Sequence, residues 1–331
     1  MNLLPQSNGV RRVNMKKKRS PKEKAQFIAK LIIIILIIGF AVQMVCNFIS
    51  KETINERVDY TTVDDKRMDY RLDGSGKYTI VFDGAIGGNL EAWTPIIDDL
   101  ESNGDDITTF TYNRRGYGFS DSGSRLRIEE QAQALKILLR KSGASAPYIL
   151  VGEEYGSLVL TSFAEQFPDA VAGVVLVNPL NENVLKNSGF SFKTTFMNLR
   201  RRIEELGSNI SLTMLMDKLG LTIDSSDFTN SLSGDSLTEF KSERTKASYT
   251  TAVVNENENL SKGLSGSQKQ GVFAGKPYCL IINNDDTSLA GLGDENLTTI
   301  IKTTETKNFL SLNDSSTILS GIRLVIEKCN G

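Results

Sequence analysis

Short apolar runs alternate with longer amphipathic stretches along most of this chain. Six runs rich in β-branched and aromatic residues have the length and flanking turns of buried strands: 77–84, 106–113, 147–152, 172–179, 277–284 and 296–303. Helical periodicity is found at 90–102, 127–142, 157–166 and 315–329. This order predicts an α/β fold, in which a mostly parallel sheet carries helices on both faces.

The alternation stops between residues 181 and 275. The periodic segments there, Phe192–Leu206, Leu212–Leu219 and Leu237–Leu260, are helical in pattern and are separated by polar, Gly-containing clusters at 222–236 and 261–271. We therefore expect a helical cap at 181–275, inserted into a core made of 76–180 and 276–331.

The N-terminal region has a different pattern. Residues 29–49 carry no charge after Lys30 and are long enough to cross a bilayer as a helix. The run is longer than the apolar part of a signal peptide and no A-x-A site follows it, and bulky Val45 argues against lipidation at Cys46. The sequence therefore predicts one uncleaved transmembrane helix.

Charge predicts how this helix is oriented. Residues 1–30 contain nine lysines and arginines and one glutamate, whereas the rest of the chain is acidic. Basic residues before a span favour the cytoplasmic side, so we expect a basic cytoplasmic tail at 1–28 that contacts membrane lipid, and a polar stalk at 50–75. The globular part is then an extracytoplasmic domain of a single-pass cell-membrane protein, and its acidity argues against nucleic acid as a partner.

Composition also limits the chemistry. The chain has no histidine, the side chain that exchanges protons near neutral pH, so a Ser-His-acid mechanism is excluded. Three cysteines are too few for a disulfide framework; Cys279 is expected to be a core thiol, and a Cys279–Cys329 bridge has no spacing signal.

Two segments resemble a known family. Residues 79–121 place a Gly-rich turn after the first strand and RRGYGFSD after the second, and residues 147–182 place GEEYG after the third. Together they resemble the α/β-hydrolase superfamily, in particular its membrane-anchored bacterial members with a helical cap, over about residues 76–330. The resemblance implies an α/β-hydrolase fold whose third strand leads into the nucleophile elbow, G-x-S-x-G.

The elbow of this chain reads Gly152-Glu153-Glu154-Tyr155-Gly156. Both glycines of the tight turn are kept, and Glu154 stands at the nucleophile position.

The other two members of the family's catalytic triad are also altered. The resemblance places Asn308 where the family has its histidine, and an amide cannot act as a general base. The triad acid corresponds either to Asn178 or to Asp285 or Asp286. The resemblance thus implies a degenerate triad with no intact catalytic residue.

The turn after the first strand borders the expected pocket. Asp83, Gly84 and Ala85 begin it, and the segment 85–88 could serve as an oxyanion hole or be only a tight turn. The glutamate and tyrosine that flank Glu154 and the second elbow glycine complete the pocket residues.

Our leading hypothesis is a catalytically inactive protein that binds a small molecule or a protein at the former active-site cleft, without metal or cofactor. One alternative is an active hydrolase or lyase that uses carboxylates, either with Glu154 as general base beside Glu153, Asp83, Asp285 or Asp286, or with Glu154 as nucleophile, as the aspartate is in some relatives. Against it, glutamate is one methylene longer than aspartate, and the ester formed in those relatives is hydrolysed by histidine-activated water. Cation binding by converging acids and a purely structural scaffold are further alternatives.

Overall fold

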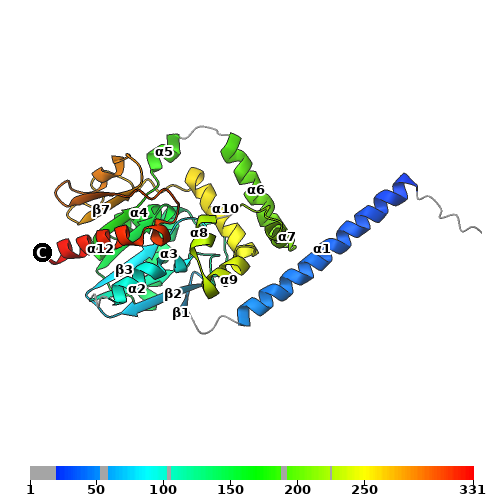
Figure 1. The fold of residues 1–331 in the computed structure, drawn as a ribbon, viewed down its shortest axis with the longest axis horizontal. Helices are drawn as coiled ribbons and strands as arrows, with labels where there is room; N and C mark the ends of the chain where they lie inside the picture. The colour runs from blue at the N-terminus through cyan, green and yellow to red at the C-terminus, as the bar shows by residue number, and fades with distance from the viewer. Residues whose placement is uncertain (1–19, 53–58, 103–105, 188–191, 224–225) are drawn as a thin grey trace, which may run out of the picture.

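The computed structural model describes residues 20–52, 59–102, 106–187, 192–223 and 226–331. Most of the predicted basic tail, including Lys16, Lys17, Lys18 and Arg19, lies outside the described residues, as do residues 53–58 of the predicted stalk. The described chain forms a layered body from which one long helix projects (Figure 1).

A sheet of eight strands, ordered β1-β2-β4-β3-β5-β6-β7-β8, forms the centre of the body in the described part of the chain. The strands are β1 Asp59–Val63, β2 Lys66–Gly74, β3 Tyr78–Asp83, β4 Ile107–Tyr112, β5 Tyr148–Glu153, β6 Val171–Val177, β7 Tyr278–Ile282 and β8 Thr298–Lys302. The strands from β4 to β8 pair in parallel, whereas β1 and β2 join antiparallel at one edge. The six predicted strands and the predicted fold class are confirmed.

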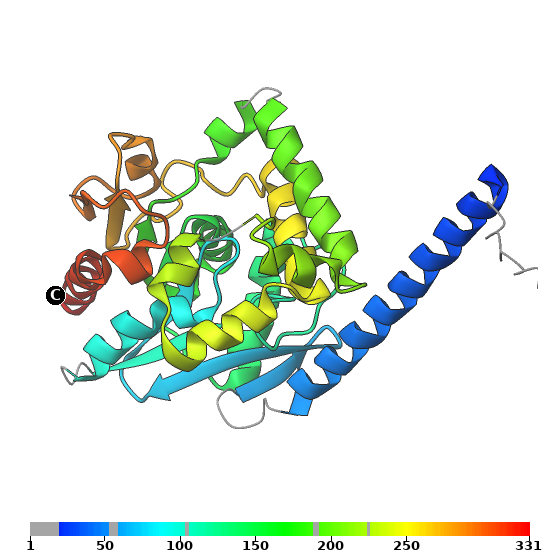
Figure 2. The ribbon, with the colours of Figure 1, turned by 45° about the vertical axis from the view of Figure 1, so that its right-hand side comes forward.

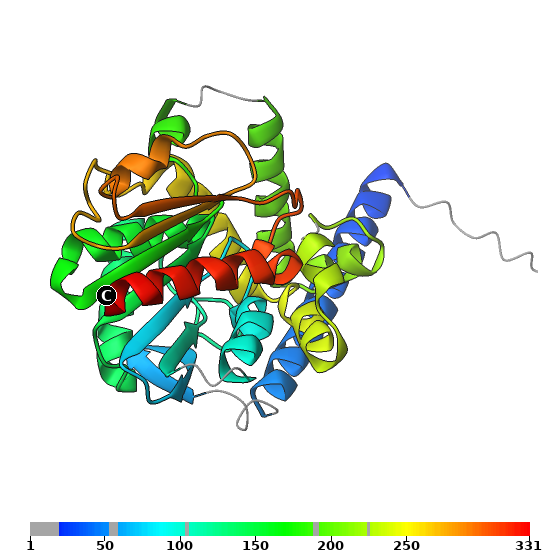
Figure 3. The same ribbon diagram turned by 60° about the vertical axis from the view of Figure 1, so that its left-hand side comes forward.

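Helices cover both faces of the sheet. Ile80 and Phe82 of β3 pack in one core cluster with α2 (Thr94–Ser102, preceded by the 3-10 turn Leu90–Trp93) and α12 (Ser315–Asn330). Val81, between them, belongs to a second cluster with α3 (Ile128–Ser142) and α4 (Tyr155–Gln166). Because successive side chains of a strand point to opposite faces, a strand buried on both sides is apolar throughout, and this is why the runs were recognisable. Figure 3 shows α12 crossing one face.

The prediction of a stalk at 50–75 is wrong over residues 59–74, which form the β1–β2 hairpin. Val63 and Met68 are buried and pack in the cluster that contains α3. In β2 the apolar residues Met68, Tyr70 and Leu72 alternate with charged ones, including buried Asp69, and give no continuous run. The sheet thereby gains two strands at one edge, with β1 outermost.

The cap is confirmed as helical, inserted between β6 and β7. Its helices are α5 Glu182–Asn187, α6 Phe192–Ser208, α7 Leu212–Lys218, α8 Ser226–Ser231, α9 Gly234–Glu243 and α10 Ala247–Lys262. The helix expected at 237–260 is two helices, because Lys246 adopts an extended backbone (φ −76°, ψ 151°) and starts α10 anew. The stretch 222–236, expected to be a polar separator, contains α8.

Helix α1 (Pro21–Glu52) contains the predicted span. Among the described residues it is the one helix long and apolar enough to cross a membrane, over Pro21–Val45. Cys279 in β7 is a buried free thiol, as expected, and its burial raises its pKa to about 12; Cys329 in α12 is also free.

Candidate functional site

The turn between β5 and α4 has the strained geometry of a nucleophile elbow. Glu154 has φ 45° and ψ −105°, a conformation that costs a non-glycine residue on the order of 1–3 kcal/mol. Its N–H donates to the carbonyl of Val177 at 3.0 Å. A Cβ on Gly156 would lie 2.1 Å from the carbonyl oxygen of Asp83, so the turn requires glycine there. The predicted elbow is therefore built as the motif implies.

Glu153 points away from solvent and is fully buried. Its carboxylate accepts hydrogen bonds from the N–H of Leu310 and, at 2.7 Å, from the hydroxyl of Ser311. Burial, with the nearby charge of Glu154, raises the pKa of Glu153 to about 7. Both carboxylate oxygens are engaged by the segment after β8, so Glu153 ties this segment to the elbow.

A cavity of about 300 Å³ lies between the elbow and the cap. Glu154, half-buried, lines it together with Ile86 and Gly87 of the turn after β3. Leu180, after β6, also lines it, and the cap contributes the rest of the wall from α6, α7, the segment after α7, the end of α9, and α10: Arg201, Glu204, Asp217, Thr222, Ile223, Arg244, Tyr249, Thr250, Val253, Asn257 and Leu260. Its volume is at the lower end of the range of small-molecule sites.

The cavity wall is mixed in charge. Arg244 forms an ion pair with Asp217, and Arg201 donates to the side-chain oxygen of Asn257 at 2.8 Å. Burial lowers the pKa of Arg201 and raises that of Glu204, whose carboxylate accepts from the N–H of Ile223 at 2.5 Å. Val253 and Leu260 supply apolar surface between these groups. The wall therefore suits a ligand with an apolar body and a few polar groups.

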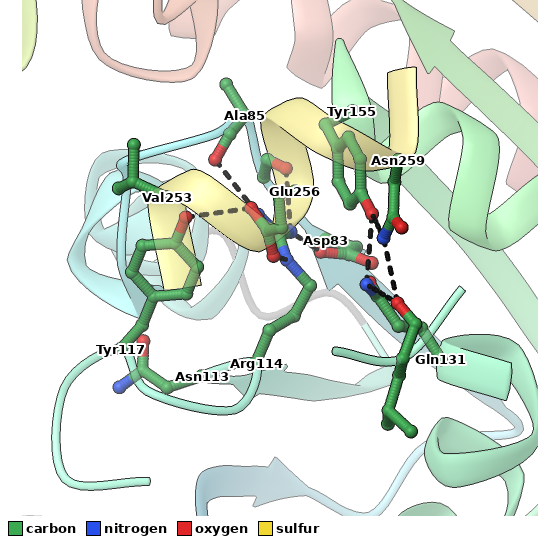
Figure 4. Close-up of polar contacts among 12 residues, drawn as sticks. Asp83, Ala85, Asn113, Arg114, Tyr117, Gln131, Tyr155, Val253, Glu256 and Asn259 are labelled. Carbon is green, nitrogen blue, oxygen red and sulfur yellow. Dashed lines mark hydrogen bonds and ion pairs between the residues drawn. The ribbon is translucent and has the colours of Figure 1, made fainter. Parts of the chain in front are cut away.

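Beside the cavity, a buried ion cluster joins the core to the cap (Figure 4). The guanidinium of Arg114, which follows β4, donates to Asp83 at the end of β3 and to Glu256 on α10, with an Nε–Oε1 distance of 2.6 Å. All three side chains are almost fully buried. Tyr112 donates to Asp83 at 2.7 Å, and Tyr117 donates to Glu256 at 2.7 Å. The expected pocket carboxylate Asp83 is thus committed to an ion pair.

The same arginine holds the turn after β3 in place. Arg114 donates to the carbonyl oxygens of Gly84 (2.8 Å) and Ala85 (3.1 Å). The N–H of Gly87 donates to the hydroxyl of Tyr117, and the N–H of Gly88 donates to the carbonyl of Ala85. Since the N–H groups of both glycines are used inside the protein, the geometry favours a tight turn over an oxyanion hole built from them.

Tyr155 does not fill the cleft. It is fully buried, and its hydroxyl accepts hydrogen bonds from Gln131 of α3 (2.9 Å) and Asn259 of α10 (2.8 Å). Figure 4 shows this second link between core and cap next to the ion cluster. Tyr155 therefore links the elbow to α3 and α10.

The other positions that the resemblance matched to the triad do not lie together. Asn178 follows β6 at the edge where β5 leads into the elbow, with φ 42°. Asn308 is exposed, and the buried residue of its loop is Phe309, in the left-handed region (φ 56°), with its ring 4.8 Å from that of Phe228. The residue of this loop that turns inward is therefore Phe309, and the matched position, Asn308, faces solvent.

Asp285 and Asp286 lie away from the cavity. The side chain of Asp285 is 97% exposed and pairs with Lys302 at 2.7 Å, and this pairing lowers its pKa. Asp286 is also exposed, and its pKa is lowered because it accepts hydrogen bonds from Ser288. Within the described ranges, no group of three or more acidic or cysteine side chains is arranged to hold a metal ion.

Sequence reasoning missed the partners that the cap supplies. Glu256 and Glu243 are both buried, and Glu243 accepts from the N–H of Gly118 and from Asn89 (3.1 Å). Burial raises the pKa of Glu243 to about 7. The one available signal was Arg114 within RRGYGFSD, since a buried arginine requires a carboxylate partner; which carboxylate was not readable.

Comparison with known proteins agrees with this geometry. The family model described as alpha/beta hydrolase fold matches residues 78–297. The uncharacterized protein YqjL of Bacillus subtilis is 32% identical over 107 residues, 32% of this chain and 41% of that protein, so the match spans less than half of that relative.

Two solved structures share the fold. Cfl2 from Burkholderia cenocepacia superposes with a TM-score of 0.64 at 17% identity, covering 81% of this chain and 94% of Cfl2. The Cif epoxide hydrolase from Acinetobacter nosocomialis gives a TM-score of 0.64 at 12% identity, covering 86% and 96%. With the elbow, the sheet order and the family model in agreement, this chain belongs to the α/β-hydrolase fold family.

Proposed function

We propose that this chain is a membrane-anchored α/β-hydrolase-fold protein that binds a ligand in the cavity between elbow and cap and does not turn it over. In this proposal α1 crosses the cell membrane with its N-terminus in the cytoplasm, and the globular domain faces outward. The apolar run of α1 and the basic residues that precede it support this orientation.

The observation that carries the proposal is the elbow itself. Glu154 keeps the strained backbone of a nucleophile and lines a cavity of about 300 Å³, in a chain without histidine. A retained pocket without a histidine to act as general base fits binding better than catalysis.

The positions of the other carboxylates do not favour catalysis by Glu154 together with a second carboxylate. Asp285 and Asp286 are exposed, and Asp83 is paired with Arg114. Glu153 is buried against Leu310 and Ser311 and is not among the residues that line the cavity. The other carboxylates that line the cavity, Glu204 and Asp217, are engaged by the N–H of Ile223 and by Arg244.

Turnover is tested with the purified full chain in detergent and p-nitrophenyl butyrate as substrate. We expect nitrophenolate release no faster than with Glu154→Ala, because that variant removes the one carboxylate at the nucleophile position. Release by the wild-type chain that disappears in Glu154→Ala would refute inactivity.

Binding is tested with the same ester, by calorimetric titration. Val253 lines the cavity on α10, so Val253→Trp should fill it and weaken binding at least about tenfold, or about 1.4 kcal/mol. Ser261→Trp, at an exposed position of the same helix, is the matched control and should bind as the wild-type chain does. Equal affinity in both variants would place the ligand elsewhere.

A further inference from the structure

Helix α6 is amphipathic, but its apolar side is exposed and its polar side faces the protein. Phe196, Leu199, Ile203 and Leu206 recur at helical spacing and form one exposed stripe, with Leu206 71% exposed. On the other side of the helix, Glu204 is buried, with its carboxylate bonded to the N–H of Ile223. A surface helix of a water-soluble protein buries its apolar stripe, so α6 has the pattern of a helix that faces an apolar medium.

The stripe continues through α7. Exposed leucines recur along this helix and just after it, and they extend the surface of α6. We name the whole set the apolar cap face: Phe196, Leu199, Ile203, Leu206, Leu212, Leu215, Leu219 and Leu221. Single exposed leucines are ordinary, but a contiguous set on adjacent elements marks an interaction surface.

Helix α1 lies against the cap where α6 meets α7. The hydroxyl of Ser211 donates to the carbonyl of Gly39 at 2.9 Å and lies 3.2 Å from the side-chain oxygen of Gln43. A Cβ on Gly39 would be 2.2 Å from the carbonyl oxygen of Ile210, so the approach requires glycine. Figure 2 shows α6 and α7 on the side of the body that faces α1.

The position of this contact along α1 determines how deep the cap would lie in a bilayer that α1 crosses. Gly39 and Gln43 precede Ile49, the end of the predicted span, by ten and six residues, or about 15 Å and 9 Å along the helix axis. Interfacial helices bury their apolar face about 5–10 Å into the boundary between headgroups and acyl chains. A bilayer crossed by α1 would therefore reach the apolar cap face, at the depth that such helices occupy or deeper.

We infer that the apolar cap face contacts the lipid of the bilayer that α1 crosses. The domain is thus seated on the membrane by its cap, and helices α6 and α7, whose polar sides line the cavity, lie at the lipid surface. The inference rests on the proposed membrane anchor, and the occupant of the face is lipid, not a second copy of the chain.

The test uses tryptophan fluorescence of the full chain in vesicles of phosphatidylcholine and phosphatidylglycerol. The native tryptophan, Trp93, is 1% exposed and serves as an internal reference. Leu215→Trp and Leu199→Trp each add one tryptophan on the apolar cap face. Ser320→Trp adds one at an exposed position of α12, at the end of the body away from α1 (Figure 1), and is the matched control.

Lipids brominated on the acyl chain should quench the tryptophan added at 215 or 199 at least about twofold more than they quench the control. Two variants on separate helices guard against misfolding of one, and circular dichroism checks each. Quenching equal to that of Ser320→Trp would overturn the inference. A blue shift of the cap tryptophan emission that increases with protein density, without quenching by bromine, would also overturn it. In that case a second copy of the chain would cover the face.

Flotation after carbonate extraction separates this failure from failure of the anchor. If the full chain leaves the vesicles in carbonate, α1 is not a span, and the inference falls together with the anchor. If the chain stays but the cap tryptophans remain unquenched, the anchor stands and only the seating of the cap is refuted.

Discussion

The buried cluster of Arg114, Asp83 and Glu256 should be the most sensitive link between core and cap. Arg114→Met removes the cation and leaves two carboxylates facing a space with no counter-charge. Deleting one partner of a buried ion pair typically costs about 3–5 kcal/mol, because the charge left behind is desolvated and unpaired. The side chain of Arg114 is 8% exposed, and those of Asp83 and Glu256 are 2% and 5%, so solvent cannot compensate.

This loss in the free energy of unfolding corresponds to a fall in the melting temperature, Tm. For a domain of this size 1 kcal/mol corresponds to about 2–4 °C, so Arg114→Met should lower Tm by about 6–20 °C. The assay is thermal unfolding of the full chain in detergent, followed by circular dichroism. Arg115→Met is the matched control: its pair with Asp64, 2.9 Å apart, is partly exposed (57% for Asp64), and its loss should cost less than about 1 kcal/mol.

The pH dependence follows from the same residues. Burial raises the pKa of both Asp83 and Glu256 above the usual range. Without Arg114 the folded state therefore takes up protons more readily than the unfolded state, and protonation stabilises it. The loss in Arg114→Met should be largest at about pH 8 and shrink towards about pH 5, and adding Glu256→Gln should recover part of it.

If Arg114→Met lowered Tm no more than Arg115→Met at neutral pH, the cluster would not hold the cap to the core. A loss that stayed constant with pH would show that the carboxylates are not left unpaired.

Two further predictions concern the elbow. The pKa of Glu153, about 7 against an ordinary 4.5, means that the folded state holds its proton where the unfolded state has lost it, so this group stabilises the fold at low pH and that contribution is lost as pH rises from about 4.5 to 7. Glu153→Gln should flatten the Tm profile over that window, and parallel profiles would contradict the argument. Gly156→Ala should lower Tm by several degrees because its Cβ would meet the carbonyl of Asp83, whereas Gly291→Ala, with nothing within 4 Å and no positive φ, should not; equal shifts would show that the elbow can relax.

Most of the sheet was readable from the sequence because strands buried on both faces are apolar at every position. The six expected strands all formed, and the elbow formed between the glycines that its turn requires. The β1–β2 hairpin was missed because its apolar residues alternate with charged ones, and this alternation does not stand out from a polar linker.

Only the part of the site that is local in sequence could be predicted from the sequence. Glu154 was correctly placed at the elbow because a strand–turn–helix is a local structure. Asn308 was matched to a loop whose inward residue is Phe309, since one residue of shift in an irregular loop reverses which side chain is buried. The pairing of Arg114 with Glu256 depends on a contact across 142 residues, and no local pattern contains it.

The sequence by itself determined the α/β architecture, the apolar helix α1 and the absence of histidine, because periodicity and composition are properties of the chain alone. Only the tertiary structure decided which carboxylates face Arg114, which line the cavity and which lie in solvent. Burial and pairing depend on segments far apart in sequence, and these segments meet only when the cap closes over the sheet.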